Sequence, residues 1–376
     1  MSKKKTYGLG EESGGGRFPA PVLPYLPQNP KSYHPNIGLI GCGGIAQSHL
    51  AAYKKAGYRV VALCDINQTQ AESRRKEFYP KADIYTDYRA VLERRDIEVV
   101  DIATHPAVRE AIIRDAIHAG KHILSQKPFV LDLTTGRKLV AAADKAGVRL
   151  AVNQNGRWAP HFSYLRQAVA QGIAGDVLGV HFTLHWNHGW IAGTAFDSIK
   201  HVLLYDFAIH WFDILNCFMG GRPAKRVFAT LAKASSQKAK PPLLGQVLID
   251  YEGAQASMSF DACADFGSLD QTIITGTKAT LISQGPNLNQ QKVTLQTSAG
   301  IASPRLGGAW FPEGFQGTMA ELLCAVEEDR EPANSARSNL DSLALCFAAV
   351  ASAENCRPVV PGKATTLAGS QGVAGN

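Results

Sequence analysis

Residues 38–46 read GLIGCGGIA, and their small residues have the spacing of a turn that binds phosphate groups. Gly41 would permit a tight turn, Gly43 would let a pyrophosphate approach the backbone, and Ala46 would let a following helix pack closely. The N-terminus of that helix would attract the phosphates. Asp65 ends the next apolar segment, where an acidic side chain can accept hydrogen bonds from both hydroxyls of an adenosine ribose. The spacing therefore predicts a dinucleotide site.

The carboxylate of Asp65 also bears on which dinucleotide would bind. A carboxylate repels the 2′-phosphate of NADP(H), so the sequence favours NAD(H) over NADP(H). Arg74 and Arg75 lie further along and could instead accommodate that phosphate. A second interpretation is that Asp65 merely caps a helix that begins near Gln68. Because Gly-Lys-Ser/Thr follows no glycine loop in the sequence, a nucleoside-triphosphate P-loop is excluded.

A lysine stands at the end of a later apolar segment. The sequence KHILS at 121–125 leads directly into Gln126, Lys127 and Pro128. Ligands of open parallel sheets bind beyond the carboxyl ends of the strands. Lys127 would therefore point into the binding crevice.

These residues must be positioned by an alternation of strands and helices. The apolar runs predict strands at 36–40, 58–64, 97–103, 121–125 and 148–153. The segments between them predict helices at 45–56, 68–79, 86–94, 107–119 and 132–146. Strands that are apolar on both faces indicate a parallel sheet with helices on each side.

After Pro160 the pattern changes. A helix at 161–171 precedes a strand at 177–186 and a very apolar helix at 201–219. Further strands are expected at 225–232, 245–251, 254–261, 270–275, 279–283 and 291–297, and two helices at 314–329 and 336–355. Close turns between some of these strands predict an antiparallel arrangement. The expected fold class is α/β, with an N-terminal Rossmann dinucleotide-binding domain and a C-terminal α/β domain that has an open, mostly antiparallel sheet.

The expected division of the chain has three parts. Residues 1–35 are rich in proline and glycine and should form an irregular arm, either free or laid across its own fold or a neighbouring subunit. Residues 36–156 would form the Rossmann domain, and residues 157–376 the domain for substrate binding and oligomerisation.

The composition excludes several classes of protein. The net charge of +7, from 39 basic and 32 acidic residues, is not clustered on a face as nucleic-acid binding requires. The sequence contains no uncharged apolar run of about 18 residues, so no membrane span is expected. The seven cysteines are scattered, and no apolar export signal follows Lys3–Lys5. A cytoplasmic protein with reduced thiols is therefore expected.

Several segments together resemble the glucose–fructose oxidoreductase/inositol dehydrogenase (Gfo/Idh/MocA) family. They are GLIGCGGIA at 38–46 with Asp65, AIHAGKHILSQKP at 116–128, RWAP at 157–160, GDVLGVHF at 175–182 and DFAIHWFD at 206–213. The resemblance implies an NAD(P)-dependent oxidoreductase that acts on CH–OH groups, with its active site between the two domains. It also implies that Lys127 is the catalytic lysine, and that Asp206 and His210 match the family's Asp-x-x-x-His pair.

The chemistry of these residues agrees with that implication. Residues four apart share a helix face, so Asp206 and His210 would project together. A histidine that titrates near neutrality suits proton transfer with an alcohol, and Lys127 could share that role. Asp206 would orient His210 and stabilise its charge. The alternative is that His210 is only a core histidine paired with Asp206.

The sequence departs from the family pattern at two positions. Gln126 stands where the family usually has a glutamate before its catalytic lysine; an amide can still hydrogen-bond a ribose hydroxyl but carries no charge. Arg109 stands where the family often has a histidine. The residues expected to bind the cofactor are Gly41, Gly43, Gly44, Ile45, Ala46, Asp65, Thr104, Gln126 and Lys127.

Histidines and tryptophans gather on the strand at 177–186 and just beyond it. Sugar sites often combine an aromatic face with polar groups, which this cluster offers. Substrate contacts are expected from Arg157, Trp158, His185, Asn187, His188 and His210. Alternation would place His181 and His185 on one face, where they could merely cover the sheet. The H-x₃-H-x₂-H spacing also suggests zinc, but His188 would point away from the other two, so no metal is expected.

The sequence as a whole predicts an NAD(H)-dependent oxidoreductase. It would transfer hydride between nicotinamide and a secondary hydroxyl of a sugar, glycoside or cyclitol, so that its partner is a small polyol or sugar-like substrate. A homodimer or homotetramer is expected, because the family resemblance suggests that the open sheet face packs on a second subunit. One alternative is an enzyme that holds NAD tightly and uses a closed redox cycle for elimination, epimerisation or glycoside hydrolysis. Another is a ligand-sensing regulatory protein without activity.

Overall fold

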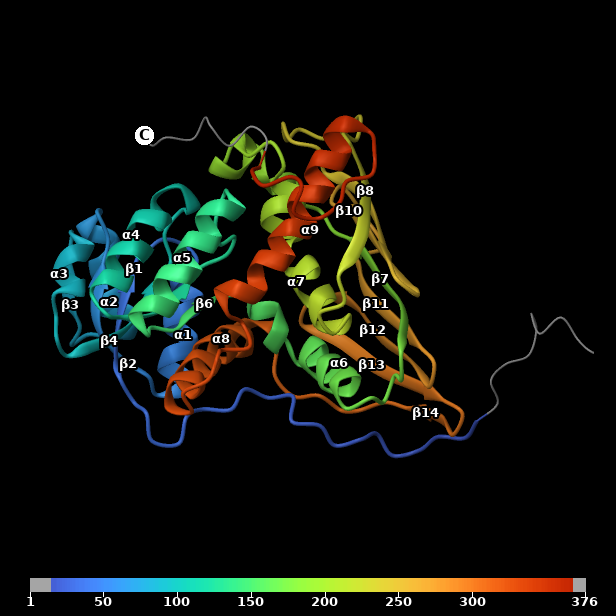
Figure 1. Cartoon of the computed structure of the whole chain (residues 1–376), viewed down its shortest axis with the longest axis horizontal. Coiled ribbons are helices and arrows are strands. Elements are labelled where there is room, and N and C mark those ends of the chain that lie inside the picture. Colours follow the sequence, from blue (N-terminus) through green and yellow to red (C-terminus); the bar gives the residue numbers. More distant parts are fainter. Residues whose placement is uncertain (1–14, 368–376) are drawn as a thin grey trace, which may run out of the picture.

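A computed structural model describes residues 15–367 of the chain, in which two sheets are joined by helices packed between them (Figure 1). The first sheet has six parallel strands in the order β3-β2-β1-β4-β5-β6. The strands are β1 (Asn36–Ile40), β2 (Arg59–Cys64), β3 (Asp83–Tyr85), β4 (Ile97–Ile102), β5 (His122–Ser125) and β6 (Leu150–Val152). The predicted Rossmann sheet is confirmed. The sequence did not reveal β3, because it has three residues and little apolar character.

Helices cover both faces of this sheet. They are α1 (Ala46–Ala56), α2 (Gln68–Phe78), α3 (Tyr88–Leu92), α4 (Pro106–His118) and α5 (Leu133–Ala146). The helix α8 (Trp310–Glu327), from the end of the chain, packs beside α1. The second half of the chain therefore contributes directly to the core of the first sheet.

The second sheet has eight strands in the order β14-β13-β12-β11-β7-β10-β9-β8. The strands are β7 (Val177–His185), β8 (Ala224–Ala232), β9 (Leu244–Tyr251), β10 (Ala254–Asp261), β11 (Leu269–Gly276), β12 (Ala279–Asn287), β13 (Gln290–Thr297) and β14 (Gly300–Ala302). Neighbouring strands are antiparallel except β7 and β10, which run parallel. The predicted mostly antiparallel sheet is confirmed.

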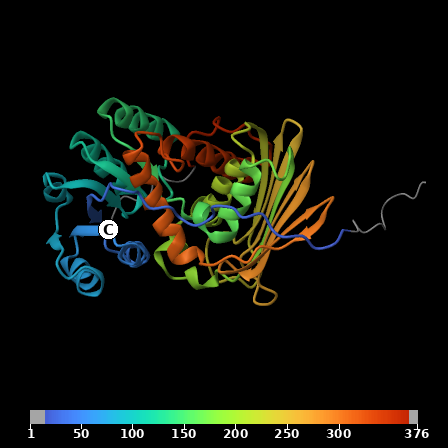
Figure 2. The ribbon, with the colours of Figure 1, turned by 90° about the horizontal axis from the view of Figure 1, so that it is seen from below.

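Helices lie on one side of the second sheet, and its other side is open (Figures 1 and 2). The covering helices are α6 (Pro160–Ala170), α7 (Ile209–Phe218) and α9 (Ala336–Asn355). Along β7, Val180, Phe182 and Leu184 are buried under these helices, while the residues between them face the open side. This alternation decides which side chains of β7 face the helices and which face the open side of the sheet.

Both ends of the described chain lie against the fold. Residues 15–35 run along the molecule, from Ile301 at the edge of the second sheet towards β1 (Figure 2). The carboxylate of Glu327 in α8 accepts the backbone N–H groups of Lys31, Ser32 and Tyr33. Of the three placements expected for the arm (free, across its own fold or across a neighbouring subunit), this part of it is laid across its own fold; residues 1–14 lie outside the described residues. At the other end, Thr365 O accepts the N–H of Leu133 at 2.8 Å.

Within residues 15–367, we find no helix that combines the length and the apolar character needed to cross a membrane.

Candidate active site

The glycine turn after β1 has the geometry that a dinucleotide requires. Gly41 has φ +98°, and a Cβ there would lie 2.8 Å from the carbonyl carbon of Ala103, so a larger residue would be strained and would clash. A Cβ on Gly43 or Gly44 would meet no described atom within 4 Å, so this side of the turn is open. Ile45 and Ala46 then lead into α1, with Ala46 fully buried. The residues present therefore fit a bound pyrophosphate.

Asp65 closes the turn from the end of β2. Its Oδ2 accepts the N–H of Cys42 at 2.7 Å, and its Oδ1 accepts the N–H of Asn67 at 2.8 Å. Asn67, and not Asp65, caps α2, because its side chain accepts the N–H groups of the first turn. Each carboxylate oxygen of Asp65 retains acceptor capacity for a ribose hydroxyl. Arg74 also reaches the turn, with Nη2 3.4 Å from Gly43 O.

A cleft of about 400 Å³ lies between the carboxyl ends of β4 and β5 and the segment 196–206 of the second half. Thr104, Gln126 and Lys127 contribute to its wall from the Rossmann side. The Thr104 hydroxyl is buried and has no hydrogen-bond partner among the described residues, which leaves it available to a ligand. The cleft is therefore where a nicotinamide and a substrate could meet.

Lys127 and Asp206 meet in this cleft from opposite halves of the chain. Lys127 Nζ donates to the backbone oxygen of Asp206 at 2.9 Å and lies 3.3 Å from Asp206 Oδ1. Their side chains are only 17% and 16% exposed, so solvent screens the ion pair less than one at the surface.

The expected pairing of Asp206 with His210 is not formed in the described structure. A π-helical turn, Leu203–Phe207, precedes α7, so the two residues do not follow one regular α-helical face. A π turn contains more residues than an α turn and rotates the side chains before it. Asp206 consequently faces Lys127.

His210 lies at the start of α7, and its ring centroid is 5.5 Å from that of Trp310. Burial, together with the nearby Lys127 ammonium, holds the pKa of His210 well below its ordinary value. The expectation that His210 titrates near neutrality is therefore wrong. The imidazole is neutral at physiological pH and can act as a hydrogen-bond or proton acceptor.

Gln126 uses its amide within the protein. Its Oε1 accepts the backbone N–H of Lys127 at 2.7 Å, and its Nε2 lies 3.2 Å from Nε2 of His49. The side chain is buried, although Gln126 contributes to the cleft wall. Buried neighbours therefore use its Oε1 and one of its two N–H groups, so an amide contact with a ribose hydroxyl is left only to the second N–H.

Arg157 and Trp158 do not reach the cleft. Arg157 is buried and binds the Asp213 carboxylate through Nε at 2.6 Å and Nη2 at 2.7 Å. The Trp158 ring is buried 5.2 Å from the guanidinium of Arg166. Both residues lie in a 3₁₀ turn at the domain junction, so the expectation of substrate contacts is corrected to a role in packing.

Two of the expected substrate ligands on and after β7 also lie elsewhere. His185 alternates with the buried Leu184 and so lies on the open face, like His181, whose Nδ1 is 2.8 Å from Ser257 Oγ. Asn187 is exposed and braces its own loop, accepting the N–H of Gly189 at 2.7 Å. Strand alternation thus turns His185 away from the cleft, while Asn187 is committed to its own exposed loop.

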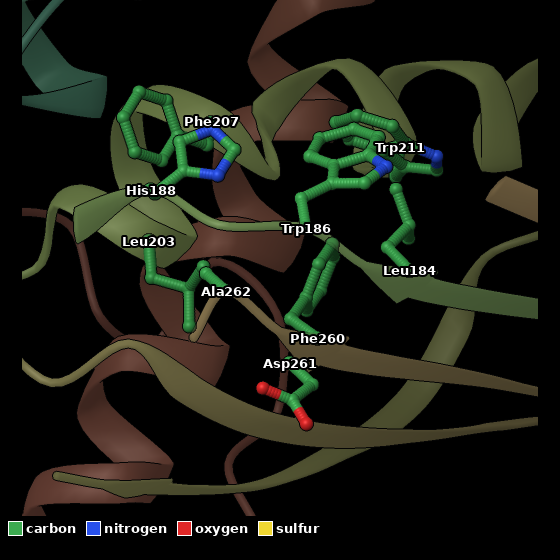
Figure 3. Close-up of a pocket in the computed structure, with 9 residues that line it drawn as sticks. All are labelled: Leu184, Trp186, His188, Leu203, Phe207, Trp211, Phe260, Asp261 and Ala262. Atoms are coloured by element: carbon green, nitrogen blue, oxygen red, sulfur yellow. The ribbon is translucent and has the colours of Figure 1, made fainter. Parts of the chain in front are cut away.

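His188 instead belongs to an aromatic cluster around a small apolar cavity (Figure 3). Its ring lies 4.4 Å from Phe207 and 5.4 Å from Trp186, and Trp186 lies 5.2 Å from Trp211. Figure 3 shows the Asp261 carboxylate directed away from these rings. Burial lowers the pKa of His188 to about 4, so this ring is neutral. In residues 15–367, no three His, Cys, Asp or Glu side chains are grouped as a metal ion would need.

Sequence reasoning missed several residues of the cleft wall. They are His105, Phe196, Ser198, Ile199, Lys200 and His201. His105 follows β4 directly and could have been found by its position at the end of a strand. The segment 196–201 carries no motif. It is held by contacts with distant residues, because the Glu354 carboxylate lies 3.0 Å from His201 Nε2 and 2.5 Å from Lys200 Nζ.

Comparisons with known proteins agree with this geometry. A family model described as "Oxidoreductase family, NAD-binding Rossmann fold" matches residues 35–154, and one for the "GFO/IDH/MocA C-terminal domain" matches residues 162–282. D-apiose dehydrogenase of Paraburkholderia graminis is 28% identical over 334 residues, which cover 85% of this chain and 88% of that protein. Inositol 2-dehydrogenase of Rhizobium meliloti is 28% identical over 335 residues, covering 86% and 98%.

Solved structures show the same architecture. A putative myo-inositol dehydrogenase from Sinorhizobium meliloti has a TM-score of 0.73 at 26% identity, covering 87% of this chain and 99% of that chain. An oxidoreductase from Agrobacterium radiobacter in complex with NAD+, L-tartaric acid and magnesium has a TM-score of 0.78 at 23% identity, covering 88% and 99%. The motif resemblance is confirmed: this chain is an enzyme that belongs to the Gfo/Idh/MocA family of oxidoreductases with an NAD-binding Rossmann domain.

Proposed function

We propose that this protein is an NAD(H)-dependent dehydrogenase that acts on a secondary hydroxyl of a sugar, glycoside or cyclitol. The observation that carries the proposal is the contact of Lys127 with Asp206, which sets a cation in a largely buried cleft beside the carboxyl end of β5. The names of the relatives, an apiose and an inositol dehydrogenase, support a small polyol as the substrate class.

In this proposal, Lys127, Asp206 and His210 are the catalytic residues. Lys127 Nζ has three protons; one is donated to the backbone oxygen of Asp206, the ammonium pairs with the Asp206 carboxylate at 3.3 Å, and a proton is left for a substrate oxygen. The ammonium stabilises the negative charge that develops on this oxygen as its proton leaves. The neutral imidazole of His210 is in the protonation state of a proton acceptor. A bound nicotinamide supplies the hydride chemistry.

We further propose that the cofactor is NAD(H) rather than NADP(H). The support is the carboxylate of Asp65, whose charge lies beside the glycine turn and opposes a 2′-phosphate. Thr104 contributes its hydroxyl to the cofactor side, and the glycine turn its backbone N–H groups. For the substrate side, the proposal moves from Arg157, Trp158, His185 and Asn187 to the cleft wall at Phe196 and His201.

We also propose that the chain forms a homodimer or homotetramer through the open face of the second sheet. Phe228 on β8 and Leu248 on β9 are cross-strand neighbours there, 36% and 58% exposed. Contiguous apolar surface can mark a contact with another protein chain, and this pair is the apolar surface on which the proposal rests. The seven unpaired cysteines support a reducing compartment, the cytoplasm.

The experiment that tests the activity is a screen of sugars, glycosides, polyols and cyclitols with NAD, followed by NADH absorbance. A dehydrogenase forms NADH in proportion to product. A closed redox cycle would convert the substrate without accumulating NADH, and a sensor protein would bind a ligand without turnover. Either outcome would contradict the proposal.

A further inference from the structure

Arg109 is a buried cation whose charge has no carboxylate partner. It lies in the first turn of α4 and is 1% exposed. None of the ion pairs within residues 15–367 includes it. Burying a guanidinium without a counter-charge is costly unless hydrogen bonds offset the cost; here the two Nη atoms have partners among the described residues and Nε has none. The cost shows in the pKa of Arg109, which burial lowers to about 10.

The hydrogen bonds of Arg109 all go to backbone oxygens around Lys127. Nη1 donates to Gln126 O at 2.6 Å and also to Pro128 O, the carbonyls on either side of Lys127. Nη2 donates to Thr104 O, beyond the carboxyl end of β4. One planar guanidinium thus ties together the two loops that carry Lys127 and Thr104 into the cleft.

The remaining groups around Lys127 are fixed from other directions. Its N–H donates to Gln126 Oε1, and its Nζ is held by Asp206. Arg109 therefore fixes both carbonyls that flank the lysine, with Ser125 Oγ as a second donor to Gln126 O at 3.2 Å, while Asp206 fixes the ammonium across the cleft. A catalytic group works only when both its backbone and its side chain are held in place.

We propose that Arg109 is a positioning residue, which fixes the loop Gln126–Pro128 so that the ammonium of Lys127 meets Asp206 in the cleft. Its influence on turnover rests on the dehydrogenase function proposed above. Arg109 contributes to the cleft wall, and its Nε has no partner among the described residues, but both Nη atoms are committed to backbone carbonyls. Its effect in this proposal therefore passes through the position of Lys127. Loss of the clamp should therefore lower kcat and leave KM and cofactor affinity nearly unchanged.

The chain offers a matched control for the loss of a buried cation. Lys121 is 7% exposed, and its Nζ donates to Arg94 O at 2.7 Å and Ile97 O at 2.8 Å. Like Arg109, it clamps backbone carbonyls in the Rossmann half, but at the end of β5 that lies away from Lys127. Lys121→Met should lower stability without changing turnover.

The experiment compares Arg109→Met, Arg109→Lys and Lys121→Met in the full chain. With Arg109→Met, kcat should fall up to about 10²-fold, the effect of misplacing a catalytic group by about 1 Å, while substrate KM and the NADH Kd should change less than about threefold. Arg109→Lys keeps the cation and part of the clamp, so it should recover part of the loss. An unchanged kcat, or a loss confined to KM, would overturn the proposal.

A second readout needs no substrate. Acetylation of Lys127 by an N-hydroxysuccinimide ester, followed by peptide mass spectrometry, reports how firmly its amine is held. The rate of this acetylation should rise about threefold or more in Arg109→Met, because this variant loosens the contact of Lys127 with Asp206. In Lys121→Met the contact is kept, so the rate should equal that of the wild type. An unchanged rate in Arg109→Met refutes the positioning role even if no substrate is ever found. An increased rate with no turnover in the wild type would instead refute only the proposed dehydrogenase function.

Discussion

Gln126 and His49 form a matched pair beneath the cleft, with Nε2 of the amide 3.2 Å from Nε2 of the imidazole. The other ring nitrogen of His49, Nδ1, lies 2.6 Å from the buried carboxylate of Asp101. With Nδ1 donating its proton to Asp101, Nε2 is left as an acceptor and needs donors. Gln126 and Asn153, 3.1 Å away, supply them.

This pair predicts that Gln126→Glu destabilises the protein, although the family usually has a glutamate here. One carboxylate oxygen could still accept the N–H of Lys127, but the other cannot donate to Nε2 of His49 and would face this acceptor with no proton between them. The free energy of unfolding should fall by about 1–3 kcal/mol, the cost of an unsatisfied buried group, in urea titrations. Gln70→Glu, on the exposed surface of α2, is the control. Equal stability of the two variants would show that the amide is not required.

The proposed chemistry predicts the effect of removing either proton-handling group. Lys127→Met and His210→Ala should each lower kcat about 10²–10⁴-fold, the usual contribution of a positioned acid or base. NADH binding should stay within about threefold of the wild type, because neither residue belongs to the glycine turn. Steady-state rates and fluorescence titration of NADH measure the two quantities.

The same chemistry predicts a smaller loss of kcat for a third variant, Asp206→Asn. Asp206→Asn keeps the backbone oxygen that Lys127 uses at 2.9 Å and loses only the carboxylate charge, so it should lower kcat less than Lys127→Met does. Lys138→Met, on the exposed side of α5, should leave kcat unchanged. If Lys127→Met and His210→Ala both retain wild-type turnover on a confirmed substrate, the catalytic groups lie elsewhere.

The position of Asp65 predicts the choice of cofactor. Asp65→Asn removes the charge but keeps the acceptor for Cys42 N–H, so NADH binding should weaken by about 1–3 kcal/mol, the contribution of hydrogen bonds to a charged group. Affinity for NADPH should improve relative to NADH, because the repulsion of the 2′-phosphate is lost. Calorimetric titration measures both. Equal affinity of the wild type for NADH and NADPH would exclude Asp65 as the selector.

Asp270 predicts a pH dependence of stability. It is 1% exposed in β11, and burial raises the pKa of its carboxyl from 3.8 to about 7. Between these values the folded protein holds a proton that the unfolded chain releases, so this contribution to stability is present at low pH and is lost as the pH rises towards 7. Asp270→Asn keeps the shape without a charge, and should stabilise the protein by about 2–4 kcal/mol at pH ~8 and much less at pH ~5.

Thermal or urea unfolding at the two pH values measures this effect. Asp176→Asn, at an exposed turn, should change stability equally at both. A benefit of Asp270→Asn that is the same at both pH values would mean that the buried carboxyl does not titrate in this range.

The open face of the second sheet predicts how the chain assembles. Leu248→Lys puts a charge at the centre of the apolar pair with Phe228, so a dimer or tetramer should dissociate to smaller species in analytical ultracentrifugation. Val108→Lys, which replaces a side chain 54% exposed on α4, should leave assembly unchanged. A wild-type chain that sediments as a monomer at micromolar concentration would rule out this contact.

The cofactor end of the molecule could be predicted from the sequence because its determinants are local. The turn at Gly41 and Gly43 follows β1 directly, and Asp65 ends the neighbouring strand. Parallel strands bring their carboxyl ends to one edge whatever the rest of the fold does. The same rule predicted that Lys127 reaches the crevice.

The substrate end was decided by tertiary structure. Lys127 and Asp206 are 79 residues apart and meet only because the two halves of the chain pack together. A π-helical turn, which spacing alone does not reveal, rotates Asp206 away from His210. The partner of Asp206 therefore depends on the segment that packs opposite it, and not on its spacing from His210 in the sequence.

Burial decided the remaining assignments. Arg157 looks like a substrate ligand in the sequence, but its guanidinium is enclosed with the carboxylate of Asp213 at 2.6 Å. Arg109, which has no such partner, is enclosed among backbone carbonyls. A sequence specifies which residues carry charge, whereas only the packed structure determines whether a charge meets a counter-ion, a carbonyl or the cleft, because these contacts join segments far apart in the chain.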